Sequence, residues 1–324
     1  MEKITHNENI TNHPDWNESY YFVFYSKDDE LGGMSRIGFK PNKQEAMTFF
    51  FLFLPDGSAA GYHQQIKQKN FTSDIKVKGM EHSWKSSGKW TYKFNGKMIF
   101  VKNSLDIAKV RENPKLISDI QFVSMDLSYE PINDPYEYSE FMTPESLEIG
   151  KKSGDKHWEQ IGVVSGKINF NSKEYLLKQV IAQRDHTYGV RDWTGVGDWF
   201  YYVVWFNKNL AINPAAIITN DGRVSTGGFI FKNGKNIPLK TLRVLNQTFQ
   251  DDNVFPISSE LEIIDAQNDI HILKAKVGPI IPVNFQDSEG NHSILVQSFG
   301  TFELDGIKGG YGTFETLRKV RKLT

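Results

Sequence analysis

Short runs of aromatic and β-branched residues recur along the chain, each bounded by turn residues, whereas helical periodicity is rare. These runs have the length and composition of β-strands, and they cover residues 20–26, 47–54, 89–94, 97–101, 199–206, 227–231 and 271–277. Turn residues between the runs predict hairpins at 55–57, 95–96, 220–222, 233–234 and 288–291. Many strands joined by tight turns predict antiparallel barrels or sandwiches rather than a parallel α/β sheet.

The chain changes character between about residues 130 and 156, where three prolines and many charges interrupt the strand pattern. We interpret this stretch as a linker. The 324 residues are about twice a typical domain length, and the linker predicts an N-terminal domain of residues 1–145 and a C-terminal domain of residues 146–324. Each domain has the size of one closed antiparallel barrel of roughly eight to ten strands, with an interior large enough for a ligand.

Composition excludes several kinds of chemistry and of partner. Without cysteine, the chain has no disulfide, no thiolate metal ligand and no cysteine nucleophile. The 38 basic residues nearly balance the 39 acidic ones, so we expect no nucleic-acid partner. The first residues lack the apolar core of a signal peptide, and no apolar run approaches the roughly 18 residues of a membrane span. We therefore expect a soluble, cytoplasmic protein without an integral membrane segment, for which transient membrane contact is a route to collect substrate.

The sequence lacks the templates of several large enzyme classes. There is no GxSxG elbow, no GxxxxGK[ST] loop and no GxGxxG that opens a helix, so serine hydrolase, P-loop and Rossmann functions lose their main support. We accordingly expect no cofactor. Aromatic residues nevertheless make up 13% of this otherwise hydrophilic chain, so either the cores or a ligand cavity must be aromatic.

The stretch RDHTYGVRDW, residues 184–193, gathers two Arg-Asp pairs, a His, a Tyr and a Trp around Gly189. It lies between two predicted strands, and we interpret it as a turn or bulge at the end of a barrel. In an extended backbone, residues 185, 187 and 189 face one side and residues 184, 186 and 188 face the other. A bulge at Gly189 would reset this alternation.

Two interpretations of the motif remain open from the residues alone. In the structural one, Arg184 and Arg191 hold Asp185 and Asp192 in an ion-pair network that locks the turn, a role that suits the guanidinium fork. In the functional one, the same network fixes a carboxylic acid or an imidazole against an aromatic cavity. A general acid needs such an apolar setting to keep its proton near neutral pH.

Other polar residues near aromatic runs are weaker candidates. His157 and Glu159 open the second half in the stretch HWEQ, and Trp16 and Glu18 precede the first aromatic strand. A polar strand face for the first stretch, and a lid or barrel plug for the second, are the favoured explanations. Asp185, His186 and Asp192 could bind a metal, but no HxH or HExxH spacing supports one, and we predict no metal site.

Several stretches together resemble a known family: WNESYYFVFYS, GGMSRIGFKPN and LFLPDG in the first half, and HWEQ, GKINF, RDHTYGVRDW and GYGTFE in the second. They are similar to the double-lipocalin superfamily of AttH-like proteins and hydroxyneurosporene synthase, also called carotenoid 1,2-hydratase. The motif resembles an RDHSWGxRDW-type signature in which Thr187 and Tyr188 replace Ser and Trp. This resemblance implies an all-β fold of two lipocalin-like antiparallel β-barrels in tandem, and relatives that include isoprenoid hydratases and cyclases working without a cofactor.

The resemblance leads to two functional hypotheses of different class. The first is an enzyme in which an acid of the motif protonates an isoprenoid or polyene, and water or an internal alkene captures the cation. We name Asp185, His186 and Asp192 as catalytic candidates, and as substrate-binding candidates Trp16, Glu18, His157, Glu159, Arg184, Tyr188, Arg191, Trp193 and Trp199. The second is a lipocalin-like carrier that binds a hydrophobic small molecule without changing it, with the motif as a structural clasp.

Overall fold

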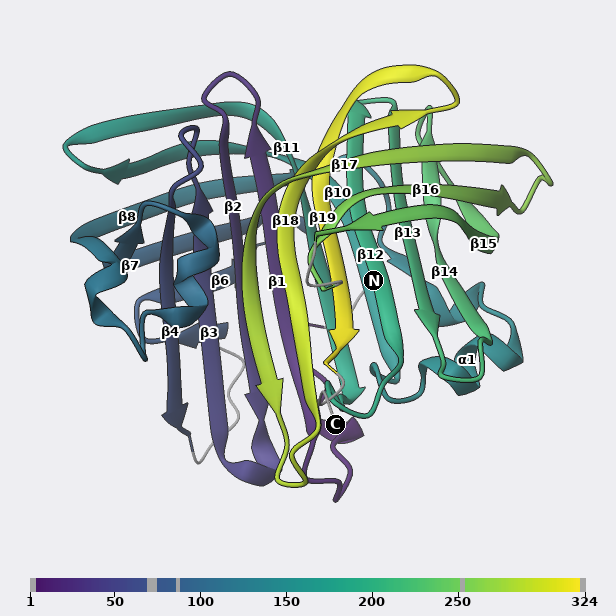
Figure 1. The fold of residues 1–324 in the computed structure, drawn as a ribbon, viewed down its shortest axis with the longest axis horizontal. Helices are drawn as coiled ribbons and strands as arrows, with labels where there is room; N and C mark the ends of the chain where they lie inside the picture. The colour runs from purple at the N-terminus through teal and green to yellow at the C-terminus, as the bar shows by residue number, and fades with distance from the viewer. Residues whose placement is uncertain (1–3, 69–74, 86–87, 251–253, 321–324) are drawn as a thin grey trace. The chain divides into compact units, whose positions relative to one another are not determined.

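The computed structural model describes residues 4–68, 75–85, 88–250 and 254–320, and most of them lie in antiparallel β-strands (Figure 1). None of these residues forms a helix long and apolar enough to cross a membrane. The chain divides into two compact units. The first unit contains Met1–Glu137 and Gly154–Arg191, and the second contains Tyr138–Ser153 and Asp192–Thr324.

The first unit is a single antiparallel sheet that returns on itself. Its strands follow the order β4-β3-β2-β1-β11-β10-β8-β7-β6-β5, β9 pairs with β10, and β4 also pairs with β7. The strands are β1 (Trp16–Ser26), β2 (Leu31–Lys40), β3 (Glu45–Phe53), β4 (Ala59–Lys67), β5 (Ile75–Val77), β6 (Met80–Trp84), β7 (Trp90–Val101), β8 (Ile117–Pro131), β9 (Tyr136–Glu137), β10 (Lys156–Phe170) and β11 (Lys173–Val190). Short 3-10 helices accompany them: η1 (Asn7–Asn9), η2 (Pro41–Lys43), η4 (Ser104–Lys109) and η5 (Pro114–Leu116).

The core of the first unit is built from alternate residues of its strands. Tyr20, Phe22 and Phe24 of β1 point into one buried cluster, in which the Phe22 ring stacks on Tyr92 with centroids 3.7 Å apart. The aromatic runs of the sequence are therefore core strands, as period-two alternation requires of a half-buried sheet.

The second unit is, in the described residues, a closed barrel in which each strand pairs with the next along the chain and β12 pairs with β19. Its strands are β12 (Asp198–Asn207), β13 (Leu210–Ile218), β14 (Val224–Lys232), β15 (Lys235–Phe249), β16 (Pro256–Asp265), β17 (Ile270–Gln286), β18 (His292–Leu304) and β19 (Ile307–Lys319). The 3-10 helix η6 (Tyr138–Glu140) and the helix α1 (Pro144–Gly150) belong to the same unit. The core contains Tyr202, Phe314 and Phe302.

The prediction of an all-β fold with antiparallel barrels is confirmed, and so are four of the five predicted turns. Gly57, Gly222, Gly234 and Gly290 each sit at positive φ between two paired strands. The turn predicted at 95–96 is wrong. Asn95 and its glycine neighbour lie inside the continuous strand β7, opposite Ser124 and Val123 of β8.

The compact units do not follow the predicted boundary at residues 145 and 146. The stretch predicted as a linker contains the two-residue strand β9 of the first sheet as well as η6 and α1. The chain then returns to the first unit, because β10 pairs with β8 and β11 pairs with β1. The sequence pattern places the motif of residues 184–193 in the C-terminal domain, but its residues up to Arg191 belong to the first unit.

The interpretation of the motif as a turn is wrong. Residues 184–190 lie within β11, an 18-residue strand paired on one side with β1 and on the other with β10. Gly189 permits this path, since its φ is +121° and a Cβ there would lie 2.2 Å from the backbone nitrogen of Asp155. The ladder with β1 continues through Gly189 to Val190 without a register shift, and the ladder with β10 ends at Tyr188.

This packing predicts that Gly189→Ala is strongly destabilising. The methyl group would meet backbone at a sub-contact distance in an unfavourable φ region, so we expect a loss of at least about 3 kcal/mol. Gly57→Ala is the matched control in the same unit, because Gly57 has φ +81° with nothing within 4 Å of its built Cβ, and we expect it to cost about 1 kcal/mol. Urea midpoints followed by tryptophan fluorescence test the difference, and equal midpoints for the two variants would contradict it.

Candidate functional site

Strand β11 lies between β1 and β10 and contributes polar side chains to both sides of the sheet. Its residues pair with β1 and β10 in an unbroken register from 182 to 188, so alternate side chains face opposite sides of the sheet. Arg184, His186 and Tyr188 lie on the side of the core residue Tyr20, which stacks on His186 at 4.5 Å. Asp185 and Thr187 lie on the other side. The alternation expected from the sequence is therefore present, and we call the two groups the inner and the outer cluster.

The inner cluster centres on the carboxylate of Glu18, which is fully buried. Glu18 Oε1 accepts hydrogen bonds from His186 Nε2 and from His6 Nδ1, each at 2.9 Å. Burial alone would raise the pKa of Glu18, but the hydrogen bonds from His186 and His6 outweigh it and hold the pKa below its usual range. Glu18 is thus a charged anchor and not a proton donor at neutral pH.

Aromatic rings enclose this anchor. The His6 imidazole stacks on Trp158 with centroids 5.4 Å apart and lies 4.3 Å from the Tyr188 ring, which in turn lies 6.2 Å from Trp16. Arg184 donates from Nε to Gln160 Oε1 at 2.9 Å, and its guanidinium lies over Trp90. These contacts place four predicted ligand-binding residues, Trp16, Glu18, Arg184 and Tyr188, in the inner cluster.

The outer cluster contains His157, Glu159 and Asp185. His157 Nε2 lies 2.7 Å from Glu159 Oε1, and its Nδ1 lies 2.6 Å from Thr187 Oγ1. Gln183 also donates to Glu159. Burial lowers the pKa of His157 to about 4, so this imidazole is neutral at physiological pH, with one nitrogen donating and the other accepting.

Asp185 differs from the other acids of the site because its carboxyl group has no direct partner within the described part of the chain. No hydrogen bond or ion pair holds it there, although polar atoms of His157 and Glu159 lie within 4.8 Å of one of its oxygens. Burial is the main reason that the pKa of Asp185 is raised to about 6; the negative charge of Glu159 also raises it, whereas the positive charges of Arg191 and Arg36 lower it. A half-buried carboxyl group of this kind carries a proton in part of the molecules near neutral pH.

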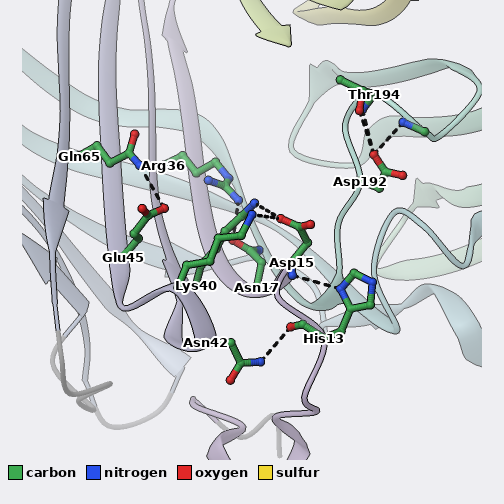
Figure 2. Close-up of polar contacts among 12 residues, drawn as sticks. His13, Asp15, Asn17, Arg36, Lys40, Asn42, Glu45, Gln65, Asp192 and Thr194 are labelled. Carbon is green, nitrogen blue, oxygen red and sulfur yellow. Dashed lines mark hydrogen bonds and ion pairs between the residues drawn. The ribbon is translucent and has the colours of Figure 1, made fainter. Parts of the chain in front are cut away.

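Asp192, the other acid named from the sequence, has a structural role. It begins a tight loop in the second unit, where its Oδ1 accepts hydrogen bonds from the backbone N–H of Gly195 at 2.7 Å and from Thr194 (Figure 2). Burial alone would raise the pKa of Asp192, but the hydrogen bonds of the loop and the charge of Lys152 lower it. Lys152 Nζ lies 3.5 Å from Asp192 Oδ2, so an ion pair adds to the hydrogen bonds of this loop.

The structure does not bring the predicted site residues together as one set. Trp193 and Trp199 lie in the second unit with Asp192, where Trp193 stacks on Phe285 at 4.7 Å. The remaining candidates lie in the first unit, on opposite sides of the sheet. His186 and Asp185 are neighbours in sequence, but alternation turns them away from each other.

Sequence reasoning missed several residues of both clusters. His6 comes from an N-terminal segment without a motif, and Arg36 from a strand noted only for its glycines. Arg36 is placed by the pairing of β2 with β1, and His6 by its hydrogen bonds to Glu18, and neither spacing nor composition encodes these non-local contacts.

Two triads have donor types that metals accept, namely His6, Glu18 and His186, and His157, Glu159 and Asp185. Hydrogen bonds among the triads and their neighbours account for the imidazole nitrogens facing Glu18 and Glu159. We assign no metal to either triad, and the absence of a metal stays a prediction.

The family model described as "Domain of unknown function (DUF7064)" matches residues 2–320, so the chain belongs to this family. No curated protein matches it in sequence.

Solved structures with the same fold are lipocalin-like double-barrel proteins, which confirms the fold that the resemblance implies. An AttH-like protein of Nitrosomonas europaea matches with a TM-score of 0.64 and 12% identity over 94% of this chain and 93% of its own. Kievitone hydratase of Nectria haematococca matches with a TM-score of 0.59 and 10% identity, over 93% of this chain and 88% of its own. CghA matches with a TM-score of 0.55 and 9% identity, over 95% of this chain and 88% of its own.

We predict that replacing Asp185 and Asp192 by Asn changes the unfolding free energy at pH 8 in opposite directions. The folded-state pKa of Asp185 is about 6, above the usual value of 3.8, so its ionisation destabilises the fold as pH rises through 6. Asp185→Asn should therefore raise the unfolding free energy at pH 8 by roughly 1 to 2 kcal/mol, after allowance for partial exposure, with little gain at pH 4.

Asp192→Asn is the matched comparison. In the parent protein the pKa of Asp192 is lowered by folding, so its ionised form stabilises the loop at pH 8. This stabilisation disappears as pH falls below the usual range of a carboxylic acid, and the variant should therefore be less stable than the parent protein at pH 8. Denaturant titrations of both variants at pH 4, 6 and 8 test the contrast. A loss of stability in Asp185→Asn at pH 8 would show that its carboxylate has a partner after all.

Proposed function

We propose that this member of the DUF7064 family binds a hydrophobic alkene, isoprenoid or polyene in character, and catalyses its acid-assisted hydration or cyclisation, with Asp185 as proton donor. The observation that carries the proposal is the Asp185 carboxyl group, which lacks a direct partner within the described residues and has a pKa raised to about 6. An acid with a pKa near the working pH combines a useful protonated fraction with the ability to give the proton away. Perturbed acids of this kind are concentrated at functional sites.

The chemistry balances with the residues of the outer cluster. Asp185 gives its proton to one carbon of a double bond, which leaves a cation at the substrate and a carboxylate at Asp185. For hydration, water adds through oxygen to the cation, and its extra proton passes to His157 and returns to Asp185. For cyclisation, an internal alkene attacks the cation, and the new cation loses a proton to Asp185, so the product is an isomer of the substrate.

His157 suits the role of base because it is neutral and oriented. Its Nε2 faces Glu159 and its Nδ1 faces Thr187, and a proton received by the ring would be stabilised by Glu159. Gln183 donates to the same carboxylate and fixes it. The resting hydrogen bond to Thr187 must be exchanged for one to water when the base acts.

The comparisons support hydration only by analogy, since the name of kievitone hydratase states a hydratase activity for that protein. The inner cluster has a positioning role in this scheme: Glu18 and His186 hold β1 and β11 in the register that presents Asp185.

An isotope experiment tests the proposal on a mixture of natural lipids. The protein is incubated with a lipid extract of its source organism in D2O and, in parallel, in H2(18)O, and the lipids are identified by mass spectrometry. Hydration predicts products that gain one water carrying 18O, and cyclisation predicts isomers with changed retention. Asp185→Asn should lower turnover at least about 100-fold while ligand retention is kept.

Turnover per bound ligand should also fall as pH rises above about 6, because Asp185 loses its proton and can no longer act as a general acid. Asp192→Asn serves as the control and should retain turnover wherever it stays folded. Lipids that are retained with neither label nor changed retention time would favour the non-catalytic carrier. Full turnover by Asp185→Asn would remove Asp185 as the donor.

A further inference from the structure

A cavity in the first unit lies apart from both polar clusters. Its volume is about 440 Å³, which is within the range of small-molecule sites. Four chain segments meet around it: the β3–β4 turn, the end of β7, the start of β8 and the β10–β11 turn. The last of these is one end of the β10–β11 hairpin, whereas Asp185 pairs with Glu159 near the other end. The cavity is therefore separate from the outer cluster.

Aromatic rings form part of the cavity wall. Phe100 and Phe170 both line the cavity, and their ring centroids lie 5.9 Å apart. Phe170 stacks in turn on Tyr175, and the ammonium group of Lys173 lies 4.1 Å from the centroid of the Tyr175 ring. The aromatic row at this end of the unit thus already accepts one cation of the chain itself.

The first residues of β8 supply polar groups to the same wall. Asp119 pairs with Phe100 and Gln121 pairs with Met98, so both polar side chains face the side of the sheet that carries the core. The next residues on this side of β8 are apolar and buried, namely Val123, Met125 and Leu127. Two polar side chains therefore end an otherwise apolar row at the point where the cavity lies.

Gln121 contributes an acceptor that has no partner among the described residues. Its Nε2 donates to Asp119 Oδ2 at 2.8 Å, and its Oε1 is buried without a hydrogen bond. The amide cannot be reversed to avoid this, because a carboxylate accepts hydrogen bonds and must therefore face the NH2 group. A buried acceptor without a donor destabilises the fold, so a ligand N–H placed at this oxygen would be stabilised.

The charges of the lining favour a cation. Two carboxylates, of Asp56 and Asp119, and one ammonium group, of Lys102, line the cavity, so one negative charge is in excess. Within the described residues the Asp119 carboxylate accepts from Gln121 and from the backbone N–H of Ile120 at 2.7 Å, and no cation pairs with it. A positive group in the cavity would therefore meet a carboxylate that no ion pair neutralises.

We infer that this cavity binds a small aromatic amine, with its ring against Phe100 and Phe170 and its ammonium group at Asp119 and Gln121 Oε1. An ammonium group brings three donors and one positive charge, which match the carboxylate, the unpartnered carbonyl oxygen and the excess charge of the lining. The aromatic rings add a favourable surface for both the ring and the cation. The inference does not depend on the proposed function, since no residue of the outer cluster lines the cavity.

Ligand-observed NMR titrations of the full-length protein test the inference with three probes at pH 7.5. Phenethylamine, phenethyl alcohol and phenylpropanoate share a phenyl ring on a short chain and present an ammonium, a hydroxyl and a carboxylate group. We expect the amine to bind at least about tenfold more tightly than either of the other two, because only it supplies a positive charge. Equal or tighter binding of the alcohol or the carboxylate, or no saturable binding of the amine, would overturn the inference.

Variants of β8 locate the bound amine. Asp119→Asn keeps the shape of the side chain and removes its charge, so it should weaken the amine at least about tenfold and leave the alcohol unchanged. Gln121→Met removes the carbonyl oxygen at similar side-chain length and should weaken the amine at least about threefold, which covers the case in which the first variant fails to fold. Asp126→Asn is the matched control, because Asp126 lies on the opposite side of the same strand, exposed and 3.3 Å from Lys93.

An unchanged affinity for the amine in Asp119→Asn and Gln121→Met would contradict the site, and so would an equal loss in Asp126→Asn. Asp185→Asn should bind the amine as the parent protein does, since Asp185 lies near the other end of the hairpin. Loss of lipid turnover in Asp185→Asn with an intact amine site, or the reverse, would separate the two proposals.

Discussion

The pairing of β11 between β1 and β10 is the constraint on which the candidate site depends. The ladder with β1 runs without a register shift from residue 182 to 190 and the ladder with β10 from 182 to 188, so a one-residue slip would exchange these side chains between core and outer side. Gly189 maintains this register because only glycine fits against the backbone of Asp155 at this position. A single strand thereby supplies His186 to the inner cluster and Asp185 to the outer cluster.

The pKa values of Glu18, Asp192 and Asp185 are shifted in different directions because the three carboxyl groups have different hydrogen-bond partners. Glu18 receives two imidazoles and Asp192 receives the N–H groups of its own loop, and in both the hydrogen bonds outweigh burial. Asp185 has burial without hydrogen bonds from any described residue, so its pKa moves in the opposite direction. A buried carboxyl group without hydrogen bonds lowers the free energy of unfolding at neutral pH. Such a locally destabilising residue is expected at a functional site.

The sequence is sufficient for the fold class, for most hairpins and for the alternation of residues 184–188, because each depends on local patterns of period two or on turn chemistry. It fails where the chain makes non-local choices. The composition of residues 130–156 resembles a linker, but β10 and β11 return to the first sheet, and no local signal distinguishes a strand that returns from one that begins a new barrel. The motif resembles a turn because charged residues and glycine are common in turns, yet Gly189 serves a close approach within a strand.

The same limit explains why the two aspartates of the motif could not be ranked from the sequence. Both follow an arginine, so an ion-pair network is the natural expectation, and in the structure the arginines reach elsewhere. Arg184 turns inward to Gln160, while Arg191 extends to Ser19 on a neighbouring strand. Arg191 therefore influences Asp185 through its charge alone, and that long-range charge is too weak to overcome burial.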